Sequence, residues 1–231
     1  MHMHHSVLLD GIDENIIIND VLTALSSTIV GTWSCWVKPT TAIATDAILS
    51  FGDTDGTSDI LFYQTGEGKL ECQFRVSGTV QWRLTTNDVV FSDGVLAHIM
   101  IVQNGTSAVL YFNGIAVAQT FLTSTDTTLW FNNIGALDNG RIGCRNRNNG
   151  GDTVFYTGNI DEILFINRAL NAAQALDVYN EGKSKDESSI ADGISYFRID
   201  RDIVNICRDS IGSNDGTYVN VEQSDVELDT P

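Results

Sequence analysis

Hydrophobic and polar residues alternate with a period of two along most of the chain, the pattern of strands that bury one face. The most informative segment is residues 97–121, "AHIMIVQNGTSAVLYFNGIAVAQTF", whose strands are apolar on both faces, as expected for the inner part of a sandwich. The Asn-Gly pairs at 104 and 113 mark two-residue turns, because both central positions of such a turn favour positive φ. They predict three antiparallel strands, the last over about 115–121. Similar turn signals recur elsewhere about every 8–12 residues, which indicates an all-β, two-sheet antiparallel sandwich.

One short helix interrupts this pattern, and it is predicted for about residues 172–180. Asn171 can cap its first turn, and Gln174 three residues later completes a capping box. Gly182 stands where a left-handed residue would end the helix. The apolar face is expected to consist of Leu176 and Tyr179.

Composition narrows the classes of partner. The 231 residues include 30 acidic and 13 basic side chains, a net charge of −17. Such a field repels a phosphate backbone, so we expect no nucleic-acid binding. The sequence contains no run of about eighteen apolar residues, so we expect no membrane insertion. The four cysteines form no C-x-x-C pair, and we expect free thiols rather than a zinc site.

Four stretches resemble concanavalin A-like, laminin-G-type jelly rolls. They are "LLDGIDENIII", "GTWSCWVKPT", "AHIMIVQNGTSAVLYFNGIAVA" and "YTGNIDEILFINRALNAAQALDVYNEG". They occur in the family's order over about residues 7–182, with Leu96 standing where the family usually has Trp. The resemblance implies a jelly-roll sandwich, of a kind also found in phage structural proteins.

The chain is interpreted as a jelly-roll domain at 6–185 followed by a strand-forming extension at 186–231. The extension contains "GISYFRIDRDIVNICRDSIGSNDGTYVN", which resembles a segment that often precedes such domains. Because the ends of a jelly roll commonly lie side by side, we expect the extension to pack on the same domain and pair with the N-terminal strand.

Asp161 and Glu162 raise the question of a glycoside hydrolase. Laminarinases of similar fold carry a Glu-x-Asp-x-x-Glu strand, and here Asn159 stands at the position of the nucleophile. Neighbours in a regular strand point to opposite faces, whereas a retaining pair needs carboxyls about 5 Å apart. His98 lies in mid-strand and makes a poor general base. We therefore predict no enzyme, with Asp161 holding a loop or helix end by hydrogen bonds.

Two acidic segments are candidates for calcium, which takes oxygen ligands. "FGDTDGTSDILF" contains Asp53, Asp55 and Asp59, although Asp and Gly also simply form turns. The family resemblance adds Asp10 and Asp13 as possible ligands.

The segment 135–156 is the best candidate for sugar binding, since its side chains can hydrogen-bond hydroxyl groups. The alternative is a flexible hairpin loop. The candidate ligand-binding residues are Arg145, Asn146, Arg147, Asn148 and Asn149.

Fold alone does not give function, and three classes stay open. The first is a non-enzymatic virion surface protein of a tailed phage, a capsid decoration, spike or fibre component made in the host cytoplasm. Its partners would be capsid or tail structural proteins, a cell-surface glycan and further copies of itself. The second is a secreted, extracellular calcium-dependent lectin that binds glycans. The third, a glycoside hydrolase, is disfavoured by Asn159.

The acidic loop yields a first test. Calorimetric titration with calcium is expected to show binding that weakens in Asp53→Ala and Asp55→Ala, because each variant removes an anionic oxygen ligand. If calcium produces no heat of binding and a chelator leaves the melting temperature unchanged, calcium binding by the acidic loop is excluded.

Overall fold

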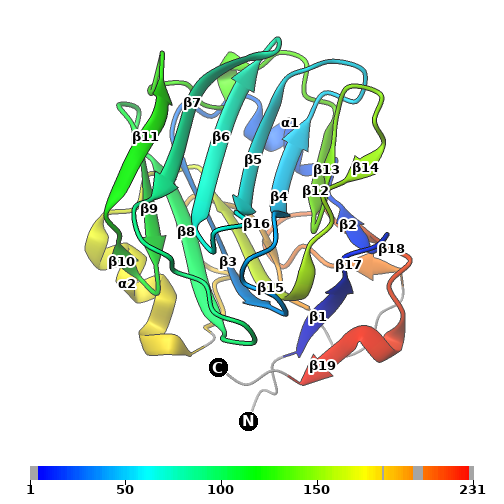
Figure 1. Cartoon of the computed structure of the whole chain (residues 1–231). Coiled ribbons are helices and arrows are strands. Elements are labelled where there is room, and N and C mark those ends of the chain that lie inside the picture. The colour runs from blue at the N-terminus through cyan, green and yellow to red at the C-terminus, as the bar shows by residue number, and fades with distance from the viewer. Residues whose placement is uncertain (1–4, 184, 200–204, 229–231) are drawn as a thin grey trace.

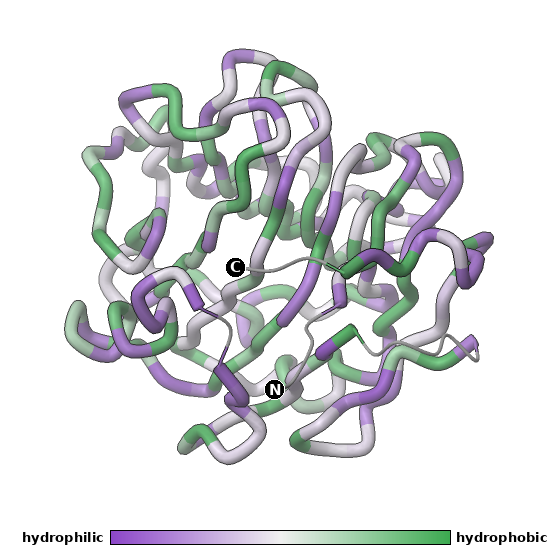
Figure 2. Tube along the Cα trace, turned by 90° about the horizontal axis from the view of Figure 1, so that it is seen from below, coloured by the Kyte–Doolittle hydropathy of each residue, from purple (hydrophilic) through white to green (hydrophobic). Residues whose placement is uncertain are grey.

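The structure is a computed structural model that describes residues 5–183, 185–199 and 205–228. Two antiparallel sheets face one another (Figure 1). Hydrophobic and hydrophilic residues alternate along many of the strands (Figure 2), so each sheet has an inner and an outer side. This confirms the two-sheet sandwich predicted from the period of two.

Among the described residues, the first sheet has eight strands. Their spatial order is β10 (Ile115–Ala116), β9 (Ala108–Phe112), β8 (Ala97–Gln103), β3 (Gly31–Pro39), β15 (Thr157–Ile166), β1 (His5–Asp10) and β19 (Val226–Leu228), with β16 (Gly193–Phe197) also paired to β15.

The second sheet has nine strands within the same described ranges. Their order is β11 (Gln119–Ser124), β7 (Thr79–Thr86), β6 (Leu70–Val76), β5 (Asp59–Gln64), β4 (Asp46–Gly52), β12 (Asn139–Ile142), β2 (Asn15–Ile17), β18 (Gly216–Val219) and β17 (Ile206–Cys207). A separate small ribbon pairs β13 (Arg145–Asn146) with β14 (Asp152–Thr153).

Short helical segments connect the strands. They are α1 (Val21–Leu25), η1 (Phe131–Asn133), α2 (Ala172–Tyr179), η2 (Asn180–Gly182) and η3 (Gln223–Asp225). None of the described helices is long and apolar enough to cross a membrane.

The C-terminal segment contributes strands to both sheets. β16 pairs with β15 and β19 pairs with β1 in the first sheet, while β18 pairs with β2 in the second. Figure 1 shows β1 and β19 side by side although they come from opposite ends of the chain.

The two Asn-Gly pairs behave differently. Asn113 and Gly114 both have positive φ, 50° and 75°, and form the predicted tight turn. At the other pair, Gly105 alone has positive φ, and the Asn104 carboxamide oxygen accepts backbone hydrogen bonds from Thr106 and Ser107. The side chain of Asn104 thus stabilises a wider turn than the two-residue one predicted.

The third strand predicted in this segment, at 115–121, is wrong in extent. The structure divides it into β10 in the first sheet and β11 in the second. Between them the chain crosses from one sheet to the other at Val117, whose N–H still donates to Leu110 of β9. Both residues of β10 are exposed, and the apolar side chains that pack on the core in this segment are Val117 at the crossing and Phe121 of β11.

Helix α2 begins as predicted and ends differently. Asn171 and Gln174 form the reciprocal capping box, each bond measuring 3.0 Å. The left-handed residue at its end is Asn180, with φ 50°, two positions before Gly182. The buried face consists of Ala175 and Val178, whereas Leu176 is 49% exposed.

The core is centred on Trp33 of β3. Its ring lies 5.3 Å from the rings of Phe51, Trp130 and Phe131 and 5.6 Å from that of Phe165. These aromatic rings come from both sheets and from η1, and each is almost fully buried. All four cysteines are also buried and free, as expected from their spacing.

We expect Trp33→Ala to lower the free energy of unfolding by about 3–5 kcal/mol, because it leaves a cavity where the two sheets meet. Ile115→Ala is the control: Ile115 is 66% exposed, and its truncation should change stability by less than about 0.5 kcal/mol. Urea denaturation followed by tryptophan fluorescence measures both. Equal losses in the two variants would contradict this account of the core.

Candidate functional site

The outer sides of the two sheets differ in chemistry. Apolar residues on the outside of the eight-stranded sheet are covered, and they pack with Ala175 and Val178 of α2 and with Tyr196 of β16. The outside of the nine-stranded sheet is mostly polar. The candidate site is therefore the outer face of this second sheet, which we call the polar face.

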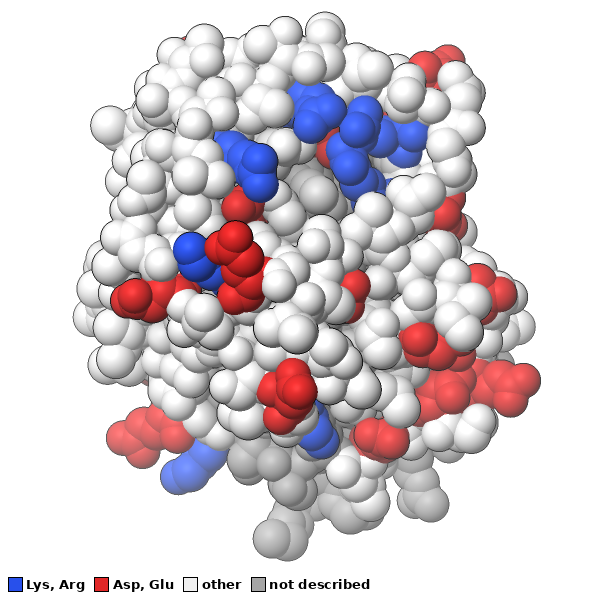
Figure 3. All heavy atoms as spheres, in the orientation of Figure 1, with Lys and Arg blue, Asp and Glu red and all other residues white. Residues whose placement is uncertain are grey.

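Strand register places a row of side chains across the polar face, all of them polar except Leu61. Arg83 of β7 pairs with Gln73 of β6, and Gln73 in turn pairs with Leu61 of β5. The row continues through Ser50 of β4 to Arg141 of β12. Directly opposed residues point to the same side of a sheet. Figure 3 shows blue Lys and Arg side chains gathered over the upper half of this face, beside a hollow.

The segment 143–156 covers the part of the polar face formed by β4. Val154 packs against Ala47, Leu61 and Tyr63. A Cβ at Gly52 would lie 2.0 Å from the backbone oxygen of Asn146, so only glycine permits this close approach. The covering segment also reaches β5 through Val154, leaves β6 and β7 open, and carries Arg145 of β13 and the following Arg147.

Three arginines surround Asp59, which has no solvent exposure. The nearest nitrogen–oxygen distances are 2.6 Å for Arg145 and 3.5 Å for both Arg75 and Arg147. Arg75 comes from β6, directly opposite Asp59 in the sheet, whereas Arg145 and Arg147 come from the covering segment. We call these three residues the arginine triad. Burial and the neighbouring charge of Arg145 lower the pKa of Arg147.

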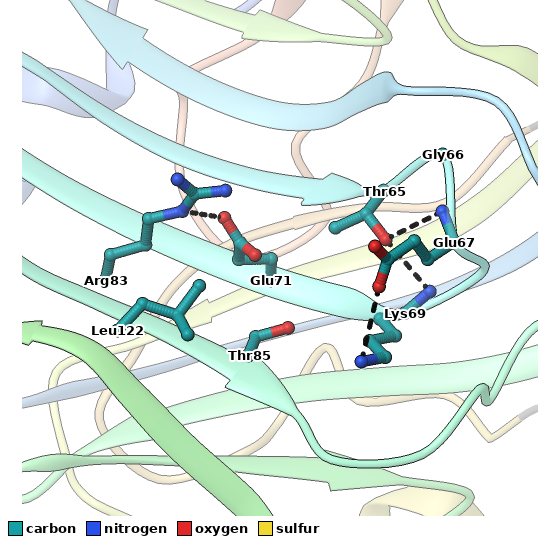
Figure 4. Close-up of a pocket in the computed structure, with 8 residues that line it drawn as sticks. All are labelled: Thr65, Gly66, Glu67, Lys69, Glu71, Arg83, Thr85 and Leu122. Atoms are coloured by element: carbon teal, nitrogen blue, oxygen red, sulfur yellow. Dashed lines mark hydrogen bonds and ion pairs between the residues drawn. The ribbon is translucent and has the colours of Figure 1, made fainter.

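A pocket of about 500 Å³ lies on the polar face, and Arg83 is the lining residue nearest to the triad in strand register, because it pairs with Gln73, two residues before Arg75. In Figure 4, Arg83 and Glu71 point toward one another, and the turn Thr65–Lys69 forms the far wall. The hydroxyl of Tyr63 and Nε of Arg83 both donate to Oε1 of Glu71. The lining residues are Thr65, Gly66, Glu67, Lys69, Glu71, Arg83, Thr85 and Leu122.

The predicted sugar-binding residues divide by side-chain direction. Alternation sends Arg145 and Arg147 to Asp59, while Nδ2 of Asn146 donates to Asp152 at 2.7 Å. Asn148 and Asn149 have positive φ, 57° and 55°, and they form the tip of the loop. The two arginines thus reach the polar face, and the three asparagines shape the segment that carries them.

Sequence reasoning missed the residues contributed by the strands themselves: Glu71, Arg75, Arg83 and Thr85. A signal for two of these positions, Glu71 and Arg75, was present in the alternation of "LECQFRV", where they and Gln73 stand between apolar residues. Without the register of β6 and β7, nothing in the sequence places Arg83 beside them.

The predicted calcium ligands of the acidic loop are only partly brought together. Oδ1 of Asp53 accepts the N–H of Gly56 at 2.9 Å, and burial, then a side-chain hydrogen bond between its protonated form and Asp55, raises the pKa of Asp53. Asp59 faces the arginine triad instead. No group of three or more His, Cys, Asp or Glu side chains within the described ranges is arranged to hold a metal ion. Calcium binding stays a prediction.

Asp10 and Asp13 lie in a turn after β1. Oδ1 of Asp10 accepts hydrogen bonds from the backbone of Ile12 at 2.8 Å and of Asp13 at 3.4 Å. The N–H of Asp10 donates to Oε2 of Glu14 at 2.7 Å. These bonds are those of a local turn, and they leave the role of both residues in calcium binding as a prediction.

Asp161 has the structural role predicted for it. It lies at a β-bulge, and its Oδ1 accepts the N–H of Ile199 at 3.0 Å and of Glu162 at 2.7 Å. Burial, then the charge of Glu162, raises its pKa well above the usual range. The bulge places Glu162 at φ 51°, so the simple alternation assumed for this pair does not hold. Asp161 connects β15 to the C-terminal segment.

The other residues considered for catalysis are also held in the fold. Nδ2 of Asn159 donates to Oγ of Ser6 at 3.0 Å and to Oε2 of Glu227 at 2.9 Å. The ring of His98 is buried 5.1 Å from that of Trp36, and burial lowers the pKa of His98 to about 3. His98 is therefore neutral at physiological pH.

A family model for the concanavalin A-like lectin/glucanases superfamily matches residues 10–175. The chain belongs to this superfamily. A search of curated proteins finds no match.

Solved structures share the superfamily fold at low sequence identity. A Ruminococcus gnavus IT-sialidase CBM40 bound to α2,3-sialyllactose has a TM-score of 0.62 and 16% identity, covering 78% of this chain and 100% of its own. The K499G mutant of NanB sialidase from Streptococcus pneumoniae has a TM-score of 0.62 and 18% sequence identity. The match covers 75% of this chain but only 27% of the sialidase. A heptameric SAP-like pentraxin from Limulus polyphemus has a TM-score of 0.55 and 15% sequence identity. The match covers 77% of this chain and 82% of the pentraxin.

Glu14 offers a test of the contact between the two ends of the chain. It is 8% exposed. Its pKa is raised to about 7 by burial and by the charges of Asp225 and Asp10, against a lowering hydrogen bond from the Asp10 backbone. The folded state thus holds a proton that the unfolded chain releases near pH 4.5. The stability linked to this proton is complete below that pH and is lost as pH rises through about 7.

We therefore expect Glu14→Gln, which mimics the protonated side chain, to be more stable than the wild type at pH 8 and similar to it at pH 4. Urea denaturation at both values measures the difference. If the difference in unfolding free energy between Glu14→Gln and the wild type is the same at pH 4 and pH 8, Glu14 does not keep its proton in the folded state.

Proposed function

We propose that the protein binds carbohydrate on its polar face, without catalysing a reaction, and that the pocket around Arg83 and Glu71 holds a sugar ring. The observation that carries the proposal is the preorganised pair itself. Glu71 accepts from Tyr63 and from Arg83, so the guanidinium is already fixed before a ligand arrives. A fixed side chain loses less conformational entropy when it binds.

The lining residues suit a sugar. Arg83 is 40% exposed along its side chain and offers planar donors, Glu71 offers acceptors, and Thr85 can do both. Leu122 supplies an exposed apolar surface for the carbon-bound face of a ring. Pockets that combine a few fixed polar groups with apolar surface are typical of small-molecule sites.

The comparisons support this proposal at the level of the domain. The CBM40 structure is a carbohydrate-binding module that this chain spans completely, and it was solved with a sialyllactose. The chain matches only about a quarter of the sialidase NanB. The similarity therefore supports a binding module as the role of this domain.

The biological setting is proposed from the sequence alone. A phage virion surface protein, in contact with capsid or tail structural proteins, would use the polar face to attach to a host glycan. A secreted lectin is the alternative setting. Electron microscopy of native particles labelled with an antibody to this chain separates the two.

Arg83→Ala is expected to weaken glycan binding at least about tenfold, since a hydrogen bond from a charged donor contributes about 1.5–3 kcal/mol. A glycan array identifies the ligand, and calorimetry measures its affinity. Arg168→Ala is the matched control, because Arg168 pairs with Asp192 outside the polar face. Wild-type affinity in Arg83→Ala, with the fold intact by circular dichroism, would exclude this pocket.

A further inference from the structure

The arginine triad carries more positive charge than its surroundings neutralise. Arg75, Arg145 and Arg147 converge on the single carboxylate of Asp59, which leaves two positive charges. Among the described residues, Asp59 is the carboxylate with which all three arginines form ion pairs. Partly buried charges of one sign are costly unless a counterion joins them.

The hydrogen bonds of the triad are also incomplete. The charges are close, but three donor atoms have no hydrogen-bond acceptor in good alignment: Nε of Arg75, Nη2 of Arg145 and Nε of Arg147. Neither carboxylate oxygen of Asp59 has an aligned donor. Each guanidinium has five N–H donors, whereas a carboxylate accepts at about four positions. Asp59 therefore holds the three side chains together while leaving donors over for another group.

The triad can be reached from solvent and lies beside the proposed sugar pocket. Its side chains are 16–21% exposed. Arg75 follows Gln73 by two residues on β6, and Gln73 lies opposite Arg83. Two residues along a strand span about 7 Å, so Arg83 lies near the triad, whereas Glu71 in the pocket is four residues from Arg75, about 13 Å along β6. A glycan with one ring in the pocket therefore reaches the triad with an acidic group on its neighbouring sugar unit.

The ligand class follows from these charges. We propose that the arginine triad is an anion subsite that receives a carboxylate or sulfate group of an acidic glycan whose ring lies in the pocket. This inference rests on the proposed function. The net charge of −17 repels extended polyanions, which favours a glycan with an isolated acidic group over a nucleic acid. Guanidinium groups suit this role because they bind planar or tetrahedral oxyanions through paired N–H donors.

A first experiment tests the subsite without any sugar. The Nε–Hε resonances of arginine are followed by NMR during titration with sodium sulfate or sodium acetate, against sodium chloride at equal ionic strength. We expect saturable shifts for Arg75, Arg145 and Arg147 that chloride does not cause and that Arg147→Gln abolishes. Equal effects of all three salts would reveal charge screening alone and overturn the inference.

A second experiment compares glycans by calorimetry: lactose, 3′-sialyllactose and sulfated lactose. An acidic group held by the triad should strengthen binding about tenfold over lactose. The two acidic ligands distinguish carboxylate from sulfate as the preferred group. Arg147→Gln should remove this advantage and keep the affinity for lactose, whereas Arg83→Ala should weaken all three.

The outcomes separate the two proposals. Equal binding of the three glycans would overturn the anion subsite and leave carbohydrate binding in place. Sulfate-specific shifts without binding of any glycan would keep the subsite and refute the sugar pocket. Arg147→Lys, which keeps the charge but loses the planar donors, provides a folded variant if Arg147→Gln fails to fold, and it should lose most of the preference for acidic ligands.

Discussion

The contact of Trp33 with aromatic rings from both sheets is the constraint on which the rest of the structure depends. Because side chains in a strand alternate, burying Phe51 against Trp33 turns its neighbours Ser50 and Gly52 outward. The same rule turns Glu71, Gln73 and Arg75 to the polar face, because Cys72 and Phe74 point into the core. The positions of the strand residues in the candidate site are thus a consequence of how the interior packs.

The sequence was sufficient for features that depend on near neighbours and insufficient for those that depend on distant ones. The capping box of α2 and the turn at Asn113 involve residues within a few positions, and both form as predicted. The grouping of Asp59 with Asp53 and Asp55 rested on proximity in sequence. In the structure, strand pairing brings Arg75 opposite Asp59, and the covering segment brings Arg145 from the other half of the chain. A single sequence contains neither relation.

The same limit explains the pair Asp161 and Glu162. Alternation was the argument against a paired catalytic role for these two adjacent strand residues, but the β-bulge makes the geometry irregular, so their side-chain directions do not follow from it. What decides the role of Asp161 is a backbone N–H from Ile199, in a segment that forms no regular strand there. Only the folded chain shows that a buried carboxylate is used to attach the C-terminal segment to β15.

The pairing of β1 with β19 has a mechanical consequence. His5 pairs with Leu228. The first and the last described residues therefore lie side by side at one edge of the first sheet. If both ends were tethered, tension would open this short pair one hydrogen bond after another, beginning at the outside, and the body of the sandwich would not transmit the load. The polar face, on the other sheet, would keep its shape under a force that had already peeled the final strand away.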